Sequence, residues 1–190
     1  MGTLSYTATI SIDGYAADGE GDFQWSAPDS DVFDFHLERM AKVSTEILGR
    51  KAYLLMRYWE QEPTDEQWTE AEHEFARRWQ GLDIVAASST LTAAELAPAH
   101  RLVPHLDLDE IRRIVEDADG EVEIFGPTVA ADAIRAGMVQ DFGIFVVPKV
   151  VGGGLRALPG DVRLDLDLVE RRIFDNGTAY LHYTPHTVGP

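Results

Sequence analysis

The sequence predicts an α/β protein whose central sheet is mostly parallel and ends in an antiparallel hairpin. Short β-like runs alternate with helical patterns over the first three-quarters of the chain, as expected when helices cover both faces of a parallel sheet. The last two β-like runs flank Asp175-Asn176-Gly177, a typical hairpin turn. No stretch resembles a linker between two cores, so we expect a single domain over residues 1–190.

In the first half of the chain, apolar spacing and turn-forming residues define the expected elements. Residues 4–10 are rich in β-formers, and Phe33, Leu37 and Met40 recur at helical spacing. Phe75 and Trp79 lie four apart ahead of Gly81, which favours a short helix. We expect strands over 4–10 and 45–48, helices that begin at residues 28 and 50, an exposed connection over 60–69, and a helix over 70–80.

The second half continues the same alternation. Ile111, Ile114 and Val115 have helical spacing, and Pro127 suits the first position of a helix because its missing N–H costs nothing there. We expect strands over 83–87, 122–125, 141–147, 163–174 and 178–183, and helices over 107–117 and 127–137.

Composition excludes several classes of function. The formal net charge is −17, from 33 acidic and 16 basic residues, and such a field repels nucleic acid and anionic membranes. The chain has no cysteine, which rules out disulfides and thiolate chemistry. The six histidines form no metal-binding pattern, so we expect no metal site. No signal sequence or membrane-length apolar run is visible, and we expect a cytoplasmic protein.

Gly49-Arg50-Lys51 is the most informative local feature, because it lies where a predicted strand passes into a predicted helix. Glycine allows a ligand to approach the backbone, and the first helical N–H groups lack partners. Together with two cationic side chains, this favours an anion such as the phosphate of a nucleotide. The alternative is a tight turn that carries solvated basic residues.

Two further strand ends have similar chemistry: Ser88-Ser89-Thr90 and Gly126-Pro127-Thr128. In open α/β sheets, ligands bind outside the carboxyl ends of the strands. Hydroxyl groups there could bind phosphate or ribose. Each segment taken alone suits a helix cap or a turn equally well. The occurrence of all three after β-like runs favours nucleotide binding.

The order and spacing of five segments carry a resemblance to a known family. The segments are Ser11-Ile12-Asp13-Gly14-Tyr15, Ile47-Leu48-Gly49-Arg50-Lys51-Ala52-Tyr53, Ile124-Phe125-Gly126, Gly137-Met138-Val139-Gln140-Asp141 and Val147-Pro148-Lys149-Val150-Val151-Gly152-Gly153-Gly154. Over nearly its whole length the chain resembles the dihydrofolate-reductase-like family, which includes the reductase domain of bifunctional riboflavin-biosynthesis enzymes. The resemblance implies a three-layer sandwich, a bound NADPH and a homodimer.

The resemblance also implies which residues hold the cofactor. Gly49, Arg50 and Lys51 match the segment at the phosphates, and Gly126, with Pro127 and Thr128 after it, matches the glycine pair at the pyrophosphate. Ser88 and Ser89 match the strand end near the adenosine ribose, and Ala8 matches the residue near the nicotinamide carboxamide. The family usually has threonine in place of Ala52, glycine in place of Pro127 and often arginine after the serine at the third strand end, so NADH is not excluded.

Three acidic residues are candidate proton donors. Dihydrofolate reductases place a carboxylate on the first helix with phenylalanine one turn later, and both Asp29 with Phe33 and Asp31 with Phe35 have that spacing. An aspartate at a helix start is often a cap instead. Asp13 is the third candidate, although Asp-Gly is also a common turn.

The substrate region is less defined by sequence. Phe23 and Trp25 lie in a loop that could cover a flat ring or pack on the core, and Lys149 and Gly153 lie in a glycine-rich segment that could contact the substrate or only connect strands. We expect an NADPH-dependent oxidoreductase resembling 5-amino-6-(5-phosphoribosylamino)uracil reductase, which transfers hydride to a small heterocyclic or carbonyl substrate. The alternative is a non-catalytic nucleotide-binding or interaction protein that retains the fold.

Overall fold

A computed structural model describes residues 2–186 and contains one large sheet and one small sheet. In sheet order, the large sheet consists of β5 (Arg101–Val103), β4 (Asp83–Ala87), β3 (Val43–Gly49), β6 (Glu121–Phe125), β1 (Leu4–Ser11), β7 (Asp141–Val147), β10 (Ala179–Pro185) and β9 (Leu166–Ile173). The small sheet pairs β2 (Tyr15–Ala17) with β8 (Leu155–Arg156).

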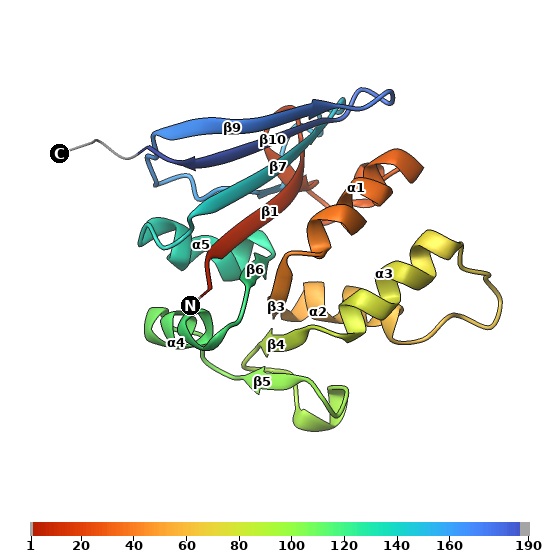
Figure 1. Ribbon diagram of the computed structural model, residues 1–190. Helices are drawn as coiled ribbons and strands as arrows, with labels where there is room; N and C mark the ends of the chain where they lie inside the picture. The colour runs from red at the N-terminus through yellow and green to blue at the C-terminus, as the bar shows by residue number, and fades with distance from the viewer. Residues whose placement is uncertain (1, 187–190) are drawn as a thin grey trace.

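The helices lie on both faces of the large sheet (Figure 1). They are α1 (Ser30–Met40), α2 (Arg50–Met56), α3 (Glu70–Gln80), α4 (Leu108–Asp117) and α5 (Pro127–Arg135), with short 3-10 helices η1 (Gln24–Ser26), η2 (Arg57–Glu60) and η3 (Ala93–Glu95). Helices α4 and α5 cover one face, whereas α1, α2 and α3 cover the other. None of the helices within residues 2–186 is long and apolar enough to cross a membrane.

Strand directions confirm the predicted fold class. β5, β4, β3, β6, β1 and β7 run parallel to one another, and β10 runs antiparallel to both β7 and β9. Gly177 occupies the turn between β9 and β10 at a φ of 84°, a conformation that favours glycine. The architecture is a three-layer sandwich with a mostly parallel central sheet, as expected.

The core is divided by the sheet. On the face of α4 and α5, Tyr6, Ile124 and Phe142 belong to one continuous apolar cluster with Ile111 and Ile134. The opposite face carries two smaller clusters, one under α2 and α3 and one under α1. Two charged side chains bond to members of these clusters: the buried Glu46 to Trp79 of the first, and the partly buried Arg39 to Tyr180 of the second.

Some elements differ from the expectation. β5 was not predicted, because it has only three residues and the prolines Pro98 and Pro104 flank it closely, so no alternating pattern develops. β2 and β8 were also not predicted, because they pair only with each other across a long sequence separation. The strand expected over 163–174 is shorter and begins at Leu166.

Glu46 lies in the middle of β3 and is buried against α3. Its carboxyl group accepts a hydrogen bond of 2.8 Å from the indole N–H of Trp79, and its register partner on β6 is Glu123. Burial, followed by the charge of Glu123, raises the pKa of Glu46 to about 8. The folded protein therefore holds Glu46 as a neutral acid at neutral pH.

Glu46→Gln should make stability less dependent on pH. Because the pKa is raised from 4.5 to about 8 on folding, Glu46 contributes stability that is complete below pH 4.5 and is lost as the pH rises through 8. Between these pH values, the free energy of unfolding of the wild type should fall by up to about 1.4 kcal/mol per pH unit relative to that of Glu46→Gln. Urea unfolding at pH 5 and pH 8 measures this difference.

The matched control is Glu116→Gln, a change of an exposed glutamate on α4. Its unfolding free energy should follow the wild type at both pH values. Equal pH slopes for the wild type and Glu46→Gln would show that Glu46 ionises normally in the folded protein.

Candidate functional site

The parallel strands β4, β3 and β6 end side by side, level with Ala8 of β1, which runs on to Ser11 beside β7. Gly49 on β3 pairs with Ala87 on β4, and Phe125 on β6 pairs with both Leu48 on β3 and Thr7 on β1. The residues that follow these pairs are Ser88, Arg50, Gly126 and Ala8. The four segments that were singled out in the sequence therefore lie in a row, in the order β4, β3, β6, β1.

Gly49 and Gly126 lie against the same side chain. A Cβ placed on Gly49 would lie 3.5 Å from Val129 Cβ, and one on Gly126 would lie 3.6 Å from Val129 Cγ1 and 3.9 Å from Ala52 Cβ. Gly126 has a φ of 117°, which side chains disfavour, so the backbone between β6 and α5 is exposed there without a side chain. The starts of α2 and α5 are thus neighbours, and each has unpaired N–H groups.

Arg50 and Lys51 are exposed at the start of α2. Among the described residues, neither side chain has a hydrogen-bond or ion-pair partner, so both are available to an anionic ligand. Glu95 is the nearby acid. Its carboxylate accepts bonds from the backbone N–H and hydroxyl of Thr92, and these bonds hold its pKa below the usual range, with a smaller contribution from Arg50. The edge therefore carries both signs of charge.

The hydroxyl groups of Ser88-Ser89-Thr90 and Gly126-Pro127-Thr128 differ in hydrogen bonding and exposure. Ser88 Oγ accepts bonds from the backbone N–H groups of Thr90 and Leu91 at 3.2 and 3.1 Å, so it stabilises its own turn. Ser89 is exposed. Pro127 occupies the first position of α5 and Thr128 is exposed beside it. Ser89 and Thr128 are thus the more accessible hydroxyls.

Sequence reasoning missed the strand end of β5. The backbone N–H of Ser88 donates to the carbonyl of Val103 at 3.0 Å, so β5 extends the row of strand ends by one position. His105 follows this strand and is exposed. No local signal identifies it, because its place at the edge depends on a three-residue strand.

Asp13 links two loops by hydrogen bonds. Its carboxylate accepts from the backbone N–H groups of Val151 and Gly152 at 3.2 and 2.7 Å. A bond with Ser11 and then these backbone bonds hold the pKa of Asp13 below its usual range, so it is ionised at neutral pH. A Cβ on Gly154 would lie 2.2 Å from the Ala17 carbonyl oxygen, so this close loop contact requires glycine.

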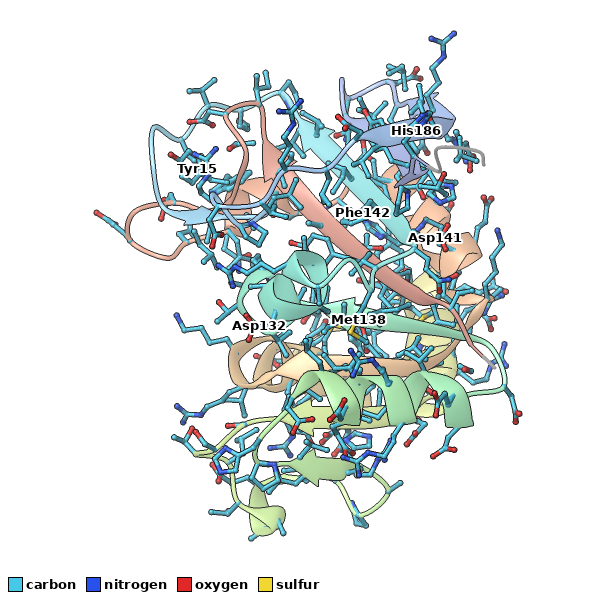
Figure 2. The ribbon with its side chains drawn as sticks, turned by 90° about the vertical axis from the view of Figure 1, so that its left-hand side faces the viewer. Tyr15, Asp132, Met138, Asp141, Phe142 and His186 are labelled. Carbon is cyan, nitrogen blue, oxygen red and sulfur yellow. The ribbon has the colours of Figure 1, made fainter. Side chains whose placement is uncertain are left out.

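The candidate substrate residues lie on these loops. Gly153 is in the loop that Asp13 holds, and Lys149 is exposed just before it, with its carbonyl accepting from Ile12 N–H at 2.7 Å. Trp25 lies in η1, which packs beside β1, and its indole N–H donates to the Asp22 carbonyl. Phe23 precedes η1 and is 37% exposed. Figure 2 shows Tyr15 at this end of the sheet, with Asp141 and His186 at the opposite end.

The two remaining acidic candidates, Asp29 and Asp31, have different environments at the start of α1. Asp29 is the N-cap, since its side chain accepts from Val32 N–H at 3.0 Å, so the cap interpretation applies to it. Asp31 is exposed in the first turn and has no hydrogen-bond partner among the described residues. Phe35, one turn after Asp31, is buried against Phe145.

Two further residues of α1, which the sequence did not single out, face the sheet. The His36 ring stacks on Phe145 with 4.2 Å between centroids and an interplanar angle of 28°. Arg39 donates to Thr7 Oγ1 at 2.8 Å and to the Tyr180 hydroxyl at 3.2 Å. Burial, followed by the charge of Arg39, lowers the pKa of His36 to about 3. The spacing of Phe35, His36 and Arg39, which places them on one face of α1, is the sequence signal that could have identified His36 and Arg39 as facing the sheet.

The histidines near the C-terminus form separate pairs. His182 Nε2 lies 2.8 Å from Asp141 Oδ1, and His186 Nδ1 lies 2.8 Å from Asp167 Oδ2. Within residues 2–186, no group of three potential metal ligands comes together.

Comparisons with known proteins agree with this geometry. A provisionally assigned riboflavin biosynthesis protein from Shewanella sp. PV-4 is 18% identical with a TM-score of 0.73, over 97% of this chain and 99% of that one. Dihydrofolate reductase from Enterococcus faecalis, complexed with NADP(H), is 16% identical with a TM-score of 0.66, over 97% of each chain.

A third structure has a longer chain. The diaminohydroxyphosphoribosylaminopyrimidine deaminase/5-amino-6-(5-phosphoribosylamino)uracil reductase from Thermotoga maritima is 15% identical with a TM-score of 0.66, over 97% of this chain and 56% of that one. At these identities the likeness establishes the fold. No curated protein sequence matches the chain. The family described as the RibD C-terminal domain matches residues 3–180, and the chain therefore belongs to the RibD C-terminal domain family.

Proposed function

We propose that this chain is a reductase that binds NADPH, with NADH as the alternative cofactor, and transfers hydride to a small heterocyclic or carbonyl substrate. The observation that carries the proposal is the approach of Gly49 and Gly126 to one side chain, Val129, at the edge where β4, β3 and β6 end beside Ala8 of β1. Membership of the RibD C-terminal domain family supports the same function. In this proposal residues 1–190 act as one reductase domain.

The residues present fit a dinucleotide. Arg50 and Lys51 would neutralise phosphates, and the side-chain-free backbone at Gly126 would admit the pyrophosphate next to α5. Ser89 would lie near the adenosine ribose, and Ala8 near the nicotinamide. The bound cofactor supplies a hydride; the protein positions the substrate, excludes water and provides a proton.

The choice between the two cofactors depends on the adenosine end. Ser89 and Thr90 are uncharged where a 2′-phosphate would benefit from arginine, and the Glu95 carboxylate lies in the neighbourhood of Arg50. His105 adds one ionisable group beyond Ser88. This balance of charge is consistent with either cofactor, so both belong in the binding test.

The binding test is thermal unfolding with each cofactor. A cofactor at 100 times its dissociation constant should stabilise the folded state by about 2.7 kcal/mol, which raises the melting temperature by about 5–10 °C. Arg50→Ala should weaken binding by about 1–3 kcal/mol, because a charge-assisted phosphate contact is lost.

Arg113→Ala on α4 is the control, since this exposed arginine lies on a helix outside the strand-end row. The absence of any shift with millimolar NADPH or NADH would refute the proposal. A shift without NADPH oxidation by 5-amino-6-(5-phosphoribosylamino)uracil, dihydrofolate, aldehydes or quinones would instead favour the non-catalytic binding protein.

Asp31 is our candidate for the proton source, because Asp29 caps α1 and the ionised Asp13 is occupied by the loop backbone. Asp31→Asn should lower kcat about 10²–10⁴-fold in steady-state NADPH oxidation, the usual contribution of a general acid. Asp29→Asn is the matched control, since asparagine caps a helix as well as aspartate does. Equal effects of the two changes would exclude Asp31 from this role.

We also propose a homodimer that forms through β9. This strand is at the edge of the large sheet, and its side chains Val169 and Ile173 are 58% and 69% exposed. A long edge strand with exposed apolar residues is usually covered by a partner.

The double substitution Val169→Lys and Ile173→Lys should convert the dimer to a monomer, measured by size-exclusion chromatography with light scattering. Cofactor binding, at the opposite part of the sheet, should be retained. Arg171→Lys on the same strand is the control. A monomeric wild type at micromolar concentration would contradict the dimer.

A further inference from the structure

Glu95 lies on the segment that joins β4 to β5, and this segment packs against α2. Tyr53 of α2 holds it there: the tyrosine hydroxyl accepts from the backbone N–H of Ala97 at 3.1 Å and lies 3.0 Å from His100 Nδ1. Arg50 and Tyr53 are three residues apart in α2, so they share one face of the helix. The segment with Glu95 therefore packs along the helix face that carries Arg50.

Glu95 is the acidic neighbour of an unpaired arginine. Bonds from Thr92 lower the pKa of Glu95 most, and the charges of Arg50 and Arg57 lower it further. Arg57 is paired with Glu60, with 3.0 Å between Arg57 Nε and Glu60 Oε1. Among the described residues, Arg50 has no such hydrogen-bonded partner. The Glu95 carboxylate therefore reduces the positive charge that Arg50 presents to an anion.

One oxygen of the Glu95 carboxylate is open to a ligand. The other, Oε2, accepts from the backbone N–H of Thr92 at 2.8 Å and from the Thr92 hydroxyl at 2.9 Å, which fixes the side chain in a capping box. Within residues 2–186, Oε1 has no hydrogen-bond partner, and Glu95 is exposed. A fixed carboxylate with a free oxygen accepts a hydrogen bond from a hydroxyl group and repels a phosphate.

The row of strand ends relates Glu95 to the proposed cofactor. Ala8, at the proposed nicotinamide position, is on β1, and Gly126, at the proposed pyrophosphate position, follows β6. Beyond β6 the row continues through β3 to β4, so the adenosine half would extend toward Ser89. The segment that follows Ser89 contains Glu95 and packs on α2. A group on the adenosine ribose would therefore lie among Ser89, Glu95 and Arg50.

We propose that Glu95 is a specificity-determining residue of the cofactor site, whose carboxylate accepts a hydrogen bond from the 2′-hydroxyl of an unphosphorylated adenosine ribose and disfavours a 2′-phosphate. The inference rests on the proposed reductase function and deepens it by naming the side chain that discriminates between NADH and NADPH. Arg50 attracts a 2′-phosphate, and Glu95 offsets that attraction. Because the two cofactors differ only in this phosphate, the effect of Glu95 is a change in the ratio of their affinities.

The test measures the dissociation constants of NADH and NADPH for the wild type and for Glu95→Gln, by titration of cofactor fluorescence at low ionic strength. Glutamine retains the capping box and removes only the charge. Glu95→Gln should bind NADPH about tenfold more tightly than the wild type, because the repulsion of the 2′-phosphate is lost. Its NADH affinity should fall by less than about threefold, since a neutral amide oxygen is the weaker acceptor.

Two comparisons separate this role from a general change in charge. Glu72→Gln makes the same substitution in the capping box that Thr69 and Glu72 form at the start of α3, and it should leave both dissociation constants unchanged. Raising the salt concentration should reduce the difference in NADPH affinity between the wild type and Glu95→Gln, because interactions between exposed charges are screened.

The possible results separate a failure of this inference from a failure of the proposed function. An unchanged ratio of the two dissociation constants in Glu95→Gln, including equal tightening of both cofactors, would overturn the role of Glu95 while the cofactor site stands. The same change of ratio in Glu72→Gln would also overturn it. A wild type that binds neither cofactor would overturn the proposed function and this inference with it.

Discussion

The placement of α1 depends on the hydrogen bonds that the Arg39 side chain donates to the sheet. Its guanidinium reaches from α1 to Thr7 on β1 and to Tyr180 on β10, and it lies where β7 has Gly143. A Cβ at Gly143 would lie 3.2 Å from Arg39 Nη2, so the sheet accommodates the cation by lacking a side chain there. Desolvation lowers the pKa of Arg39, but Glu123 and Tyr180 outweigh it, so the charge is retained.

The consequence is a defined helix face beside the strand ends. Because Arg39 anchors one turn of α1, His36 is held against Phe145 and is kept neutral, while Asp31 remains in solvent two turns earlier. The parallel register supplies the other half of the arrangement, since it brings the ends of β4, β3 and β6 to one edge beside Ala8 of β1.

Local signals account for what the sequence could predict. Helix α3 and strand β4 have the expected bounds, because apolar spacing and a terminal glycine define them within a few residues. The strand ends at Gly49 and Gly126 were visible for the same reason. β5 and the stacking of His36 on Phe145 were not visible, since both depend on contacts between segments far apart in the chain.

The charge distribution adds a constraint on how such a site works. The proposed cofactor, which carries several phosphates, would approach a protein of net charge −17, so the long-range field would oppose association. At physiological salt this field is screened beyond about 8 Å, whereas direct contacts are screened much less. Pro127 contributes no N–H and Ala52 no hydroxyl to the proposed phosphate region. In the proposed site, cofactor binding would therefore depend on a few short-range groups, chiefly Arg50, Lys51 and the backbone at the start of α5.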